Sequence, residues 1–499
     1  MSRLLLAFFL VFTSMQLKAE PKPVVLAIVA QDQTPLRAAP KAASPLQASL
    51  WQGEALEIRG ERLDYLQVYD YRRERGGYVR AGALRRVVLD PEHAPELLSV
   101  VRFLRGTPGS EALGLAFAAA YVQAAPSDAL KGPDGIETLD AIGTMADRLA
   151  RRASSDAARG AAGKTISAHL EVASHHGVRF AGNERDGRVH VCYEGDAFRR
   201  VLQMRSEPAQ RARAALGLTR AECMPGDLQP AERRRMDEWR VEVLDQVDVA
   251  PLAAWERNRV LLRRAAVWSA LAYQRARTGE QDGAPAQAAA SRALDALSRV
   301  SKAELAEDDL PAYADAAMRV NASRWALQPA PTQGPSAPSG RPSLLTVAGA
   351  PGETCLLLVD GKNGAQQPLA RRCTYGLVWA GSATLNREGN ALAVAVQPTE
   401  AWRELWVFRK AGSTWTVRVL PPASTNPEVG YAEFAGWVPG GAQLLVAREA
   451  AGEGRYRRNF ELVRLDTLGT VRQVPDPSML GAFQRWQDAA WKRQTLALR

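Results

Sequence analysis

The stretch CLLLVDGKNGAQQPLARRC, residues 355–373, carries the clearest fold signal in the chain. An apolar run at 356–359 precedes the turn-forming residues 360–364, and a polar segment leads back to Cys373. Gly364 is the midpoint between the two cysteines. An antiparallel hairpin folded there would place Cys355 opposite Cys373, within disulfide reach. The spacing therefore predicts both the hairpin and the bond.

The chain has 499 residues and four cysteines, too few for a disulfide scaffold. Once Cys355 is assigned to Cys373, the remaining cysteines are Cys192 and Cys223, which we predict to pair by elimination. Each bridge restricts the unfolded chain and is worth about 2–4 kcal/mol. Disulfides persist mainly in exported proteins, so this pairing predicts an oxidising compartment.

The N-terminus independently predicts export. Arg3 precedes an almost purely apolar core from Leu4 to Met15, and Ala19 is a small residue at the expected cleavage point. This pattern is typical of a secretory signal peptide over residues 1–19. No cysteine follows the core, so a lipid anchor is not expected. Since no stretch reaches the roughly 20 apolar residues of a spanning helix, we expect a periplasmic or secreted protein without a transmembrane segment.

The charge balance excludes an acidic disordered chain, since the net charge is +10 with 46% hydrophobic and 24% charged residues. Only nine of the 64 basic residues are lysine. Together with the many alanines, this arginine bias indicates a GC-rich genome more than a binding surface. Scattered charges of this kind are typical of solvated helix faces, so nucleic acid is not an expected partner.

Short alternating segments fill residues 24–90 and predict a small β-barrel. Four of them carry a resemblance to the bacterial SH3-like domain, with tyrosine in place of both hallmark tryptophans: Leu36-Arg37-Ala38-Ala39-Pro40, Gly53 to Ile58, Tyr65-Leu66-Gln67-Val68 and Gly77-Tyr78-Val79. The resemblance implies a groove that binds cell-wall peptides or protein segments. The predicted ligand-binding residues are the aromatic and basic side chains around one hairpin tip: Tyr69, Tyr71, Arg72, Arg73 and Arg75.

Helical periodicity dominates residues 91–328. The longest predicted helix runs from Trp255 to Thr278 and is closed by Gly279. The small-residue packing resembles tetratricopeptide hairpins, but a period of about 34 residues is absent, so we predict an irregular α-helical array.

Residues 329–342, PAPTQGPSAPSGRP, form a proline-rich linker. Beyond it, residues 343–499 are β-rich and repeat faintly: the strand at 389–395 recurs at 441–447, 404–407 at 461–464, and 416–419 at 470–473. The units resemble the TolB-type β-propeller repeat, without its usual aspartate. The segment is too short to close a propeller alone. Either the sheets form an open stack or another chain completes them, which leaves a homo-oligomer open.

The sequence thus predicts a multidomain α+β protein with a signal peptide, an SH3-like barrel, a helical domain, a linker and a propeller-like antiparallel β domain. No catalytic, cofactor-binding or metal-ligating residue is predicted. His169, His175, His176 and His190 lie close in sequence, but no metal motif accompanies them. Gly163-Lys164-Thr165 lacks the upstream glycine and strand of a phosphate-binding loop.

Three functions remain open at this level. The first is a non-catalytic envelope protein that binds cell-wall peptide or a protein partner, or acts as a scaffold. The second is a peptidoglycan-processing enzyme with an unrecognised active site. The third is an exported binder of an anionic polymer.

Overall fold

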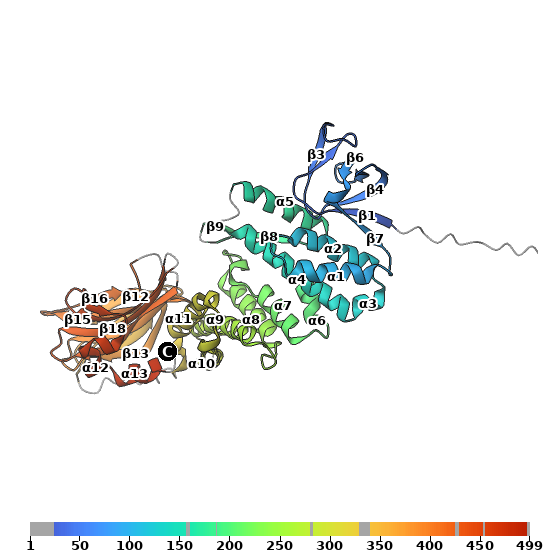
Figure 1. Ribbon diagram of the computed structural model, residues 1–499. Coiled ribbons are helices and arrows are strands. Elements are labelled where there is room, and N and C mark those ends of the chain that lie inside the picture. Colours follow the sequence, from blue (N-terminus) through green and yellow to red (C-terminus); the bar gives the residue numbers. More distant parts are fainter. Residues whose placement is uncertain are drawn as a thin grey trace, which may run out of the picture. The chain divides into compact units, whose positions relative to one another are not determined.

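The computed structural model describes residues 24–155, 160–185, 187–279, 283–328, 340–424, 429–452 and 455–496 (Figure 1). The predicted signal peptide and residues 329–339 of the predicted linker lie outside them. The described residues form a mixed α and β protein with thirteen α-helices and several largely antiparallel sheets. The chain divides into two compact units. The first comprises the described residues up to Gly182 and Val189–Ala197, and the second comprises residues 183–188 and the chain from Phe198 onward.

The first unit begins with a seven-stranded antiparallel sheet in the order β3-β2-β6-β5-β4-β1-β7. Alternation drives its formation, because Leu56, Leu66, Val68 and Val79 are all buried on one side. Within the described residues, the edge strands β3 and β7 do not pair with each other. The strands are β1 (Val24–Val29), β2 (Thr34–Arg37), β3 (Leu46–Leu50), β4 (Ala55–Arg62), β5 (Tyr65–Asp70), β6 (Arg75–Arg80) and β7 (Leu84–Leu89).

Five helices and a hairpin follow the sheet. Most of the alanine-rich helix α2 is buried, and at Gly114 a Cβ would lie 2.3 Å from the Met145 sulfur on α4. Small residues therefore set how closely these helices pack. The elements are α1 (Ala94–Arg105), α2 (Glu111–Ala124), α3 (Ser127–Lys131), α4 (Pro133–Ser154), α5 (Ala161–His175), β8 (Phe180–Arg185) and β9 (Arg188–Tyr193).

The helical part of the second unit is built around α9. This helix buries Leu261, Ala265 and Trp268, and it ends at Gly279, whose φ of 65° is left-handed. The helices α8, α10 and α11 all pack on it. The helices are α6 (Asp196–Gln203), α7 (Pro208–Leu218), α8 (Pro230–Asp245), α9 (Ala254–Thr278), α10 (Ala284–Ser298) and α11 (Leu310–Ala322); a 3₁₀ turn, Arg324–Leu327, follows α11.

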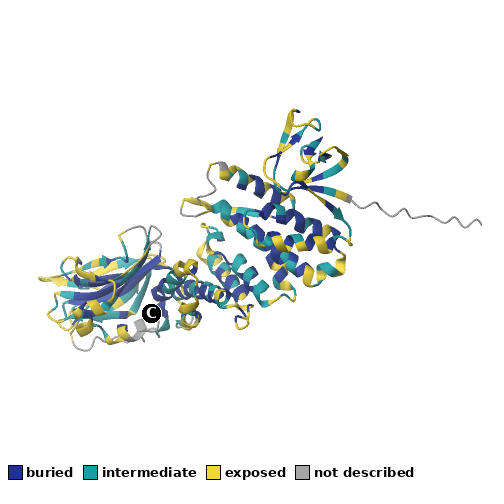
Figure 2. Cartoon of the chain, in the orientation of Figure 1, coloured by how far each residue is buried: buried dark blue, intermediate teal, exposed yellow. Residues whose placement is uncertain are grey.

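The rest of the second unit holds two sheets and two short helices, with buried residues along the central strands (Figure 2). A three-stranded sheet has the order β10-β11-β12, and an eight-stranded sheet has the order β13-β14-β15-β17-β18-β19-β20, with β16 also on β15. The elements are β10 (Ser343–Ala348), β11 (Thr354–Val359), β12 (Ala370–Thr374), β13 (Leu377–Leu385), β14 (Ala391–Thr399), β15 (Trp402–Ala411), β16 (Thr414–Leu420), β17 (Val429–Val438), β18 (Gln443–Gly452), β19 (Arg455–Arg464), β20 (Thr470–Val474), α12 (Gly481–Trp486) and α13 (Ala489–Leu496).

The repeated sequence segments fall on equivalent strands of the larger sheet: β14 and β18, β15 and β19, β16 and β20. Each set forms an antiparallel meander, β13 to β16 and β17 to β20. The two meanders join through a short parallel pairing of Trp402–Arg403 with Gly430–Tyr431. This pairing is the exception to the antiparallel arrangement expected for the segment. None of the described strands closes a propeller.

Candidate functional site

Tyr69 and Tyr71 lie together on the first unit's sheet, where β5 enters its hairpin turn. Their rings meet edge to face with centroids 4.9 Å apart. The Arg59 guanidinium lies 3.7 Å from the centre of the Tyr69 ring, which is cation–π contact. Glu57 accepts from the Tyr71 hydroxyl at 3.0 Å and from Arg59 Nε at 2.8 Å. We call these four side chains the tyrosine patch.

The strand register explains the tyrosine patch. Glu57 on β4 is directly opposite Tyr69 on β5, so their side chains share one face of the sheet. The register shifts between Ile58 and Gly60, which makes Arg59 the extra residue of a β-bulge. Sequence reasoning missed Glu57 and Arg59. Pairing the two alternating strands around the turn at Leu63 and Asp64 is the signal that would have found Glu57.

The patch combines an exposed aromatic ring with paired charges. Tyr71 is 66% exposed although it is a large side chain. Hydrogen bonds from Arg59 and then Tyr71 lower the pKa of the Glu57 carboxyl. The hydrogen bond to Glu57 likewise raises the pKa of Arg59. Both charges therefore persist at neutral pH and hold the two tyrosines in place.

Arg72 and Arg73 lie at the same hairpin tip but are directed to buried carboxylates. Arg73 donates to both oxygens of Glu54 at 2.9 Å and to Asp70 at 2.6 Å. Arg72 donates to Glu54 at 3.2 Å and also pairs with Glu171 on α5. Glu54 and Asp70 are almost fully buried. These two arginines therefore neutralise buried carboxylates and stabilise the turn. Their role is structural, and they are not available to bind a ligand.

Arg75, the last residue predicted for the ligand patch, is exposed at the start of β6. Its Nη1 donates to the carbonyl of Gln47 on β3 at 3.0 Å. The structure therefore brings Tyr69 and Tyr71 into one cluster and Arg72 and Arg73 into another. Arg75 touches the second cluster only through the backbone, since its Nε donates to the Arg73 carbonyl at 3.4 Å.

Two histidines, His169 within α5 and His176 just after it, connect this helix to loops of the sheet. His169 Nε2 lies 2.8 Å from Asp32 Oδ1, and His176 Nε2 donates to the Gly53 carbonyl at 2.9 Å. Gly53 has a φ of +89°, and a Cβ there would lie 2.4 Å from the Ala112 carbonyl oxygen, so the close approach requires glycine. Burial raises the pKa of Asp32, but the hydrogen bond and charge of His169 outweigh it and the net shift is downward.

From the burial of the His176 imidazole we predict that the stability of the first unit depends on pH. Burial lowers its pKa below the ordinary value of about 6.5. Between the two pKa values the unfolded chain binds the extra proton, so stability should fall as pH drops below about 6.5. We expect amide protection of α5, measured by hydrogen exchange and corrected for intrinsic rates, to decline in that range. His176→Gln keeps an N–H donor and should flatten the decline.

The control for this prediction is His190→Gln, which removes one imidazole from β9. It should retain the pH dependence of the parent chain. An unchanged slope in His176→Gln would contradict the assignment to His176.

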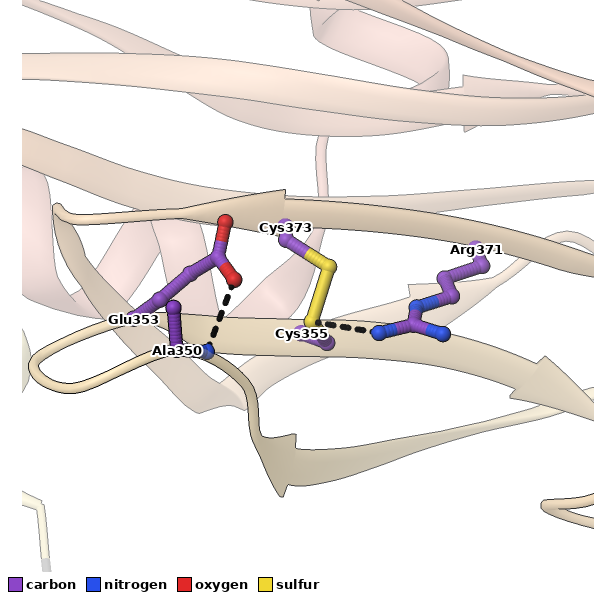
Figure 3. Close-up of a disulfide and its surroundings, with 5 residues drawn as sticks. All are labelled: Ala350, Glu353, Cys355, Arg371 and Cys373. Atoms are coloured by element: carbon purple, nitrogen blue, oxygen red, sulfur yellow. Dashed lines mark hydrogen bonds between the residues drawn. A yellow bond between two sulfur atoms is a disulfide. The ribbon is translucent and has the colours of Figure 1, made fainter.

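The second unit contains the disulfide between Cys355 and Cys373, with an S–S distance of 2.01 Å (Figure 3). The two residues are direct partners on β11 and β12. Arg371 donates to the Cys355 sulfur at 3.4 Å, and Glu353 accepts from the Ala350 amide at 3.1 Å. Cys192 and Cys223 are also in disulfide form. All four cysteines are therefore oxidised, and none provides a thiolate.

The described residues hold one grouping with ligand atoms close enough for a metal: Glu353, Cys355 and Cys373, within 4.8 Å of one another. Its two sulfurs are bonded to each other, which removes them as thiolate ligands.

Gly163, Lys164 and Thr165 lie in the first turns of α5. In the described part of the chain, no helix combines the length and apolar character that crossing a bilayer requires.

In comparisons with known proteins, no family model, curated protein or solved structure matches the chain.

Proposed function

We infer that this is an exported, non-catalytic binding or scaffold protein of the cell envelope, which recognises a cell-wall peptide or a protein segment through the tyrosine patch. The observation that carries this proposal is the exposed Tyr71 ring, held by Glu57 and by its contact with Tyr69. Rigid exposed aromatic and arginine side chains are the usual anchors of protein recognition. Because the patch is already ordered by internal contacts, little conformational entropy is lost on binding.

The proposed architecture follows the two resemblances. The first unit's sheet is an SH3-like module, and the C-terminal sheets are propeller-like meanders that dock a partner chain. The antiparallel pairing of β4, β5 and β6 supports the first assignment, and the equivalent positions of the repeated strands support the second. A second copy of this chain is one partner that would continue the sheet.

Export is supported by the oxidised state of all four cysteines. The alternative of a cysteine-dependent cell-wall hydrolase requires a free thiolate, which a disulfide does not provide. The alternative of an anionic-polymer binder comes from the net positive charge of +10, to which the arginines of this hairpin tip contribute. Since Arg72 and Arg73 are both paired with Glu54, their charge is largely cancelled locally, and this favours peptide recognition.

The test is binding of the mature protein to purified peptidoglycan. Tyr71→Ala should weaken binding about tenfold, because truncating an aromatic anchor typically costs 1–2 kcal/mol or more. The matched control is Phe103→Ala on α1, since Phe103 is an aromatic side chain of similar exposure, 71% against 66%. It should bind like the parent.

Two further measurements separate the alternatives. Release of soluble fragments from the peptidoglycan would contradict the non-catalytic assignment. If peptidoglycan is not retained, a photo-crosslinking residue at position 71 should capture a protein partner in the envelope. Binding that is equal in the parent and Tyr71→Ala would contradict the role of the patch.

A further inference from the structure

A cavity of about 230 Å³ lies within the second unit. It is lined by the 3₁₀ turn after α11, by strands β13, β14, β15 and β17, and by the start of α13. Its wall combines buried charge with aromatic surface: Arg324, Arg403, Glu433, Trp325, Phe434 and Trp491. Arg403 is fully buried, and Arg324 and Glu433 are less than one-tenth exposed.

The wall has an excess of hydrogen-bond donors. Within the described residues, five buried N–H groups on it lack an acceptor: Nε and Nη1 of Arg324, Nε of Arg403, and the indole Nε1 of Trp325 and of Trp491. Leaving a buried donor unsatisfied costs about 1–3 kcal/mol. An acceptor inside the cavity would therefore be strongly favoured.

The main acceptors on the wall already have partners, apart from Glu433 Oε1, which is ion-paired but accepts no hydrogen bond among the described residues. Glu433 pairs with Arg324 and, at 3.5 Å, with Arg403. Asp488 accepts from the backbone amides of Ala490 and Trp491 at the start of α13. The Ser382 hydroxyl is likewise engaged, because it donates to the Trp379 carbonyl at 2.6 Å and accepts from the Ala395 amide at 2.8 Å. These contacts leave the five donors unsatisfied within the described residues.

The buried charges do not balance. Among the buried side chains of the wall, two guanidinium groups face one carboxylate, which leaves one positive charge in excess. The other carboxylate of the wall, Asp488, is half-buried and accepts from the N-terminus of α13. Burial lowers the pKa of Arg403 to about 10, so this guanidinium stays charged at neutral pH. An excess buried charge is costly unless it is paired, and water supplies acceptors but no charge.

We propose that this cavity binds a small organic monocarboxylate. Its carboxylate would accept hydrogen bonds from Arg324 and Arg403 and cancel the excess charge. A flat apolar remainder would pack against Trp325, Phe434 and Trp491. The size fits a compact ligand, because the cavity is below the roughly 300–1,000 Å³ of drug-sized pockets. The single excess charge favours a monoanion over a phosphate dianion.

The experiment is isothermal titration of the full mature chain with matched acids and amides. The probes are acetate, benzoate and indole-3-acetate, their neutral amides, and inorganic phosphate. We expect at least one aromatic acid to bind, with its amide at least about tenfold weaker, because a hydrogen bond to a charged group is worth about 1.5–3 kcal/mol. Trp325→Phe keeps an aromatic ring but loses the indole N–H donor, and it should weaken binding of the acid about tenfold. Arg324→Gln should weaken it further.

The matched control is Trp437→Phe. The Trp437 indole N–H is also buried without an acceptor among the described residues, but it is not on the cavity wall. Its substitution should leave the affinity unchanged. Equal binding of acid and amide, an equal loss in Trp437→Phe, or no binding by any probe would overturn the proposal. Tighter binding of phosphate than of every carboxylate would overturn the assignment to a monocarboxylate. Parent-like thermal unfolding of Trp325→Phe separates lost binding from lost folding.

Discussion

Replacing Arg403 by methionine should lower the free energy of unfolding of the second unit by about 1–3 kcal/mol, because it leaves buried carbonyl groups without their hydrogen-bond donor. Arg403 lies on β15, and its Nη1 donates to the carbonyls of Asn321 and Ala322 at 2.7 and 3.2 Å. These carbonyls end α11 and have no partner further along the helix. Arg403 therefore caps α11 from the sheet and also pairs with Glu433. Its removal leaves the two α11 carbonyls short of a donor, whereas Glu433 keeps its ion pair with Arg324.

Tryptophan emission during urea unfolding measures this effect, since eleven of the twelve tryptophans lie in the second unit. Arg409→Met is the matched control, because Arg409 lies on the same strand and is only half-buried. A surface substitution of this kind should stay within about 0.5 kcal/mol. Equal unfolding midpoints for Arg403→Met and Arg409→Met would refute the capping role.

Removing the Cys355–Cys373 bridge should lower the free energy of unfolding by about 3 kcal/mol, the entropic value for a loop of this size. The sequence separation is 18 residues. Cys355 is fully buried, so the variant Cys355→Val, Cys373→Ala fills its site with an apolar side chain. The same urea titration, at non-reducing conditions, measures the shift of the midpoint.

The control uses a reductant. Dithiothreitol should lower the midpoint of the parent by more than that of the variant, because the variant has already lost one bridge. A variant with the midpoint of the oxidised parent would show that this bond does not stabilise the folded chain.

The sequence predicted secondary structure well where the residues that define an element lie within one short segment. The hairpin around Gly364 has its register fixed by the spacing of the turn and the two cysteines. The long helix predicted at Trp255–Thr278 is α9, Ala254–Thr278, since apolar periodicity and Gly279 define its face and its end. The mixed α and β structure with antiparallel sheets was likewise predicted from local periodicity and turn residues. The SH3-like and propeller-like assignments stay predictions.

The tyrosine patch was only partly predictable. Tyr69 and Tyr71 were found because exposed aromatics near a turn are visible in one short stretch. Arg72 and Arg73 have the same local appearance, but their partners Glu54 and Glu171 are 18 and 99 residues away from Arg72. No local pattern distinguishes an arginine that faces solvent from one that pairs with a distant carboxylate.

The sequence by itself determined the cysteine pairing at 355 and 373, the end of α9 and the alternation of the first sheet, because each depends on residues close in the chain. Tertiary structure alone decided which charges are buried. Arg403 meets the end of α11 across 82 residues, and Arg324 meets Glu433 across more than 100. The buried donors, the excess charge and the cavity exist only where these segments converge. The unsatisfied donors arise from the packed fold, because burial removes the water that would otherwise accept a hydrogen bond from each N–H group.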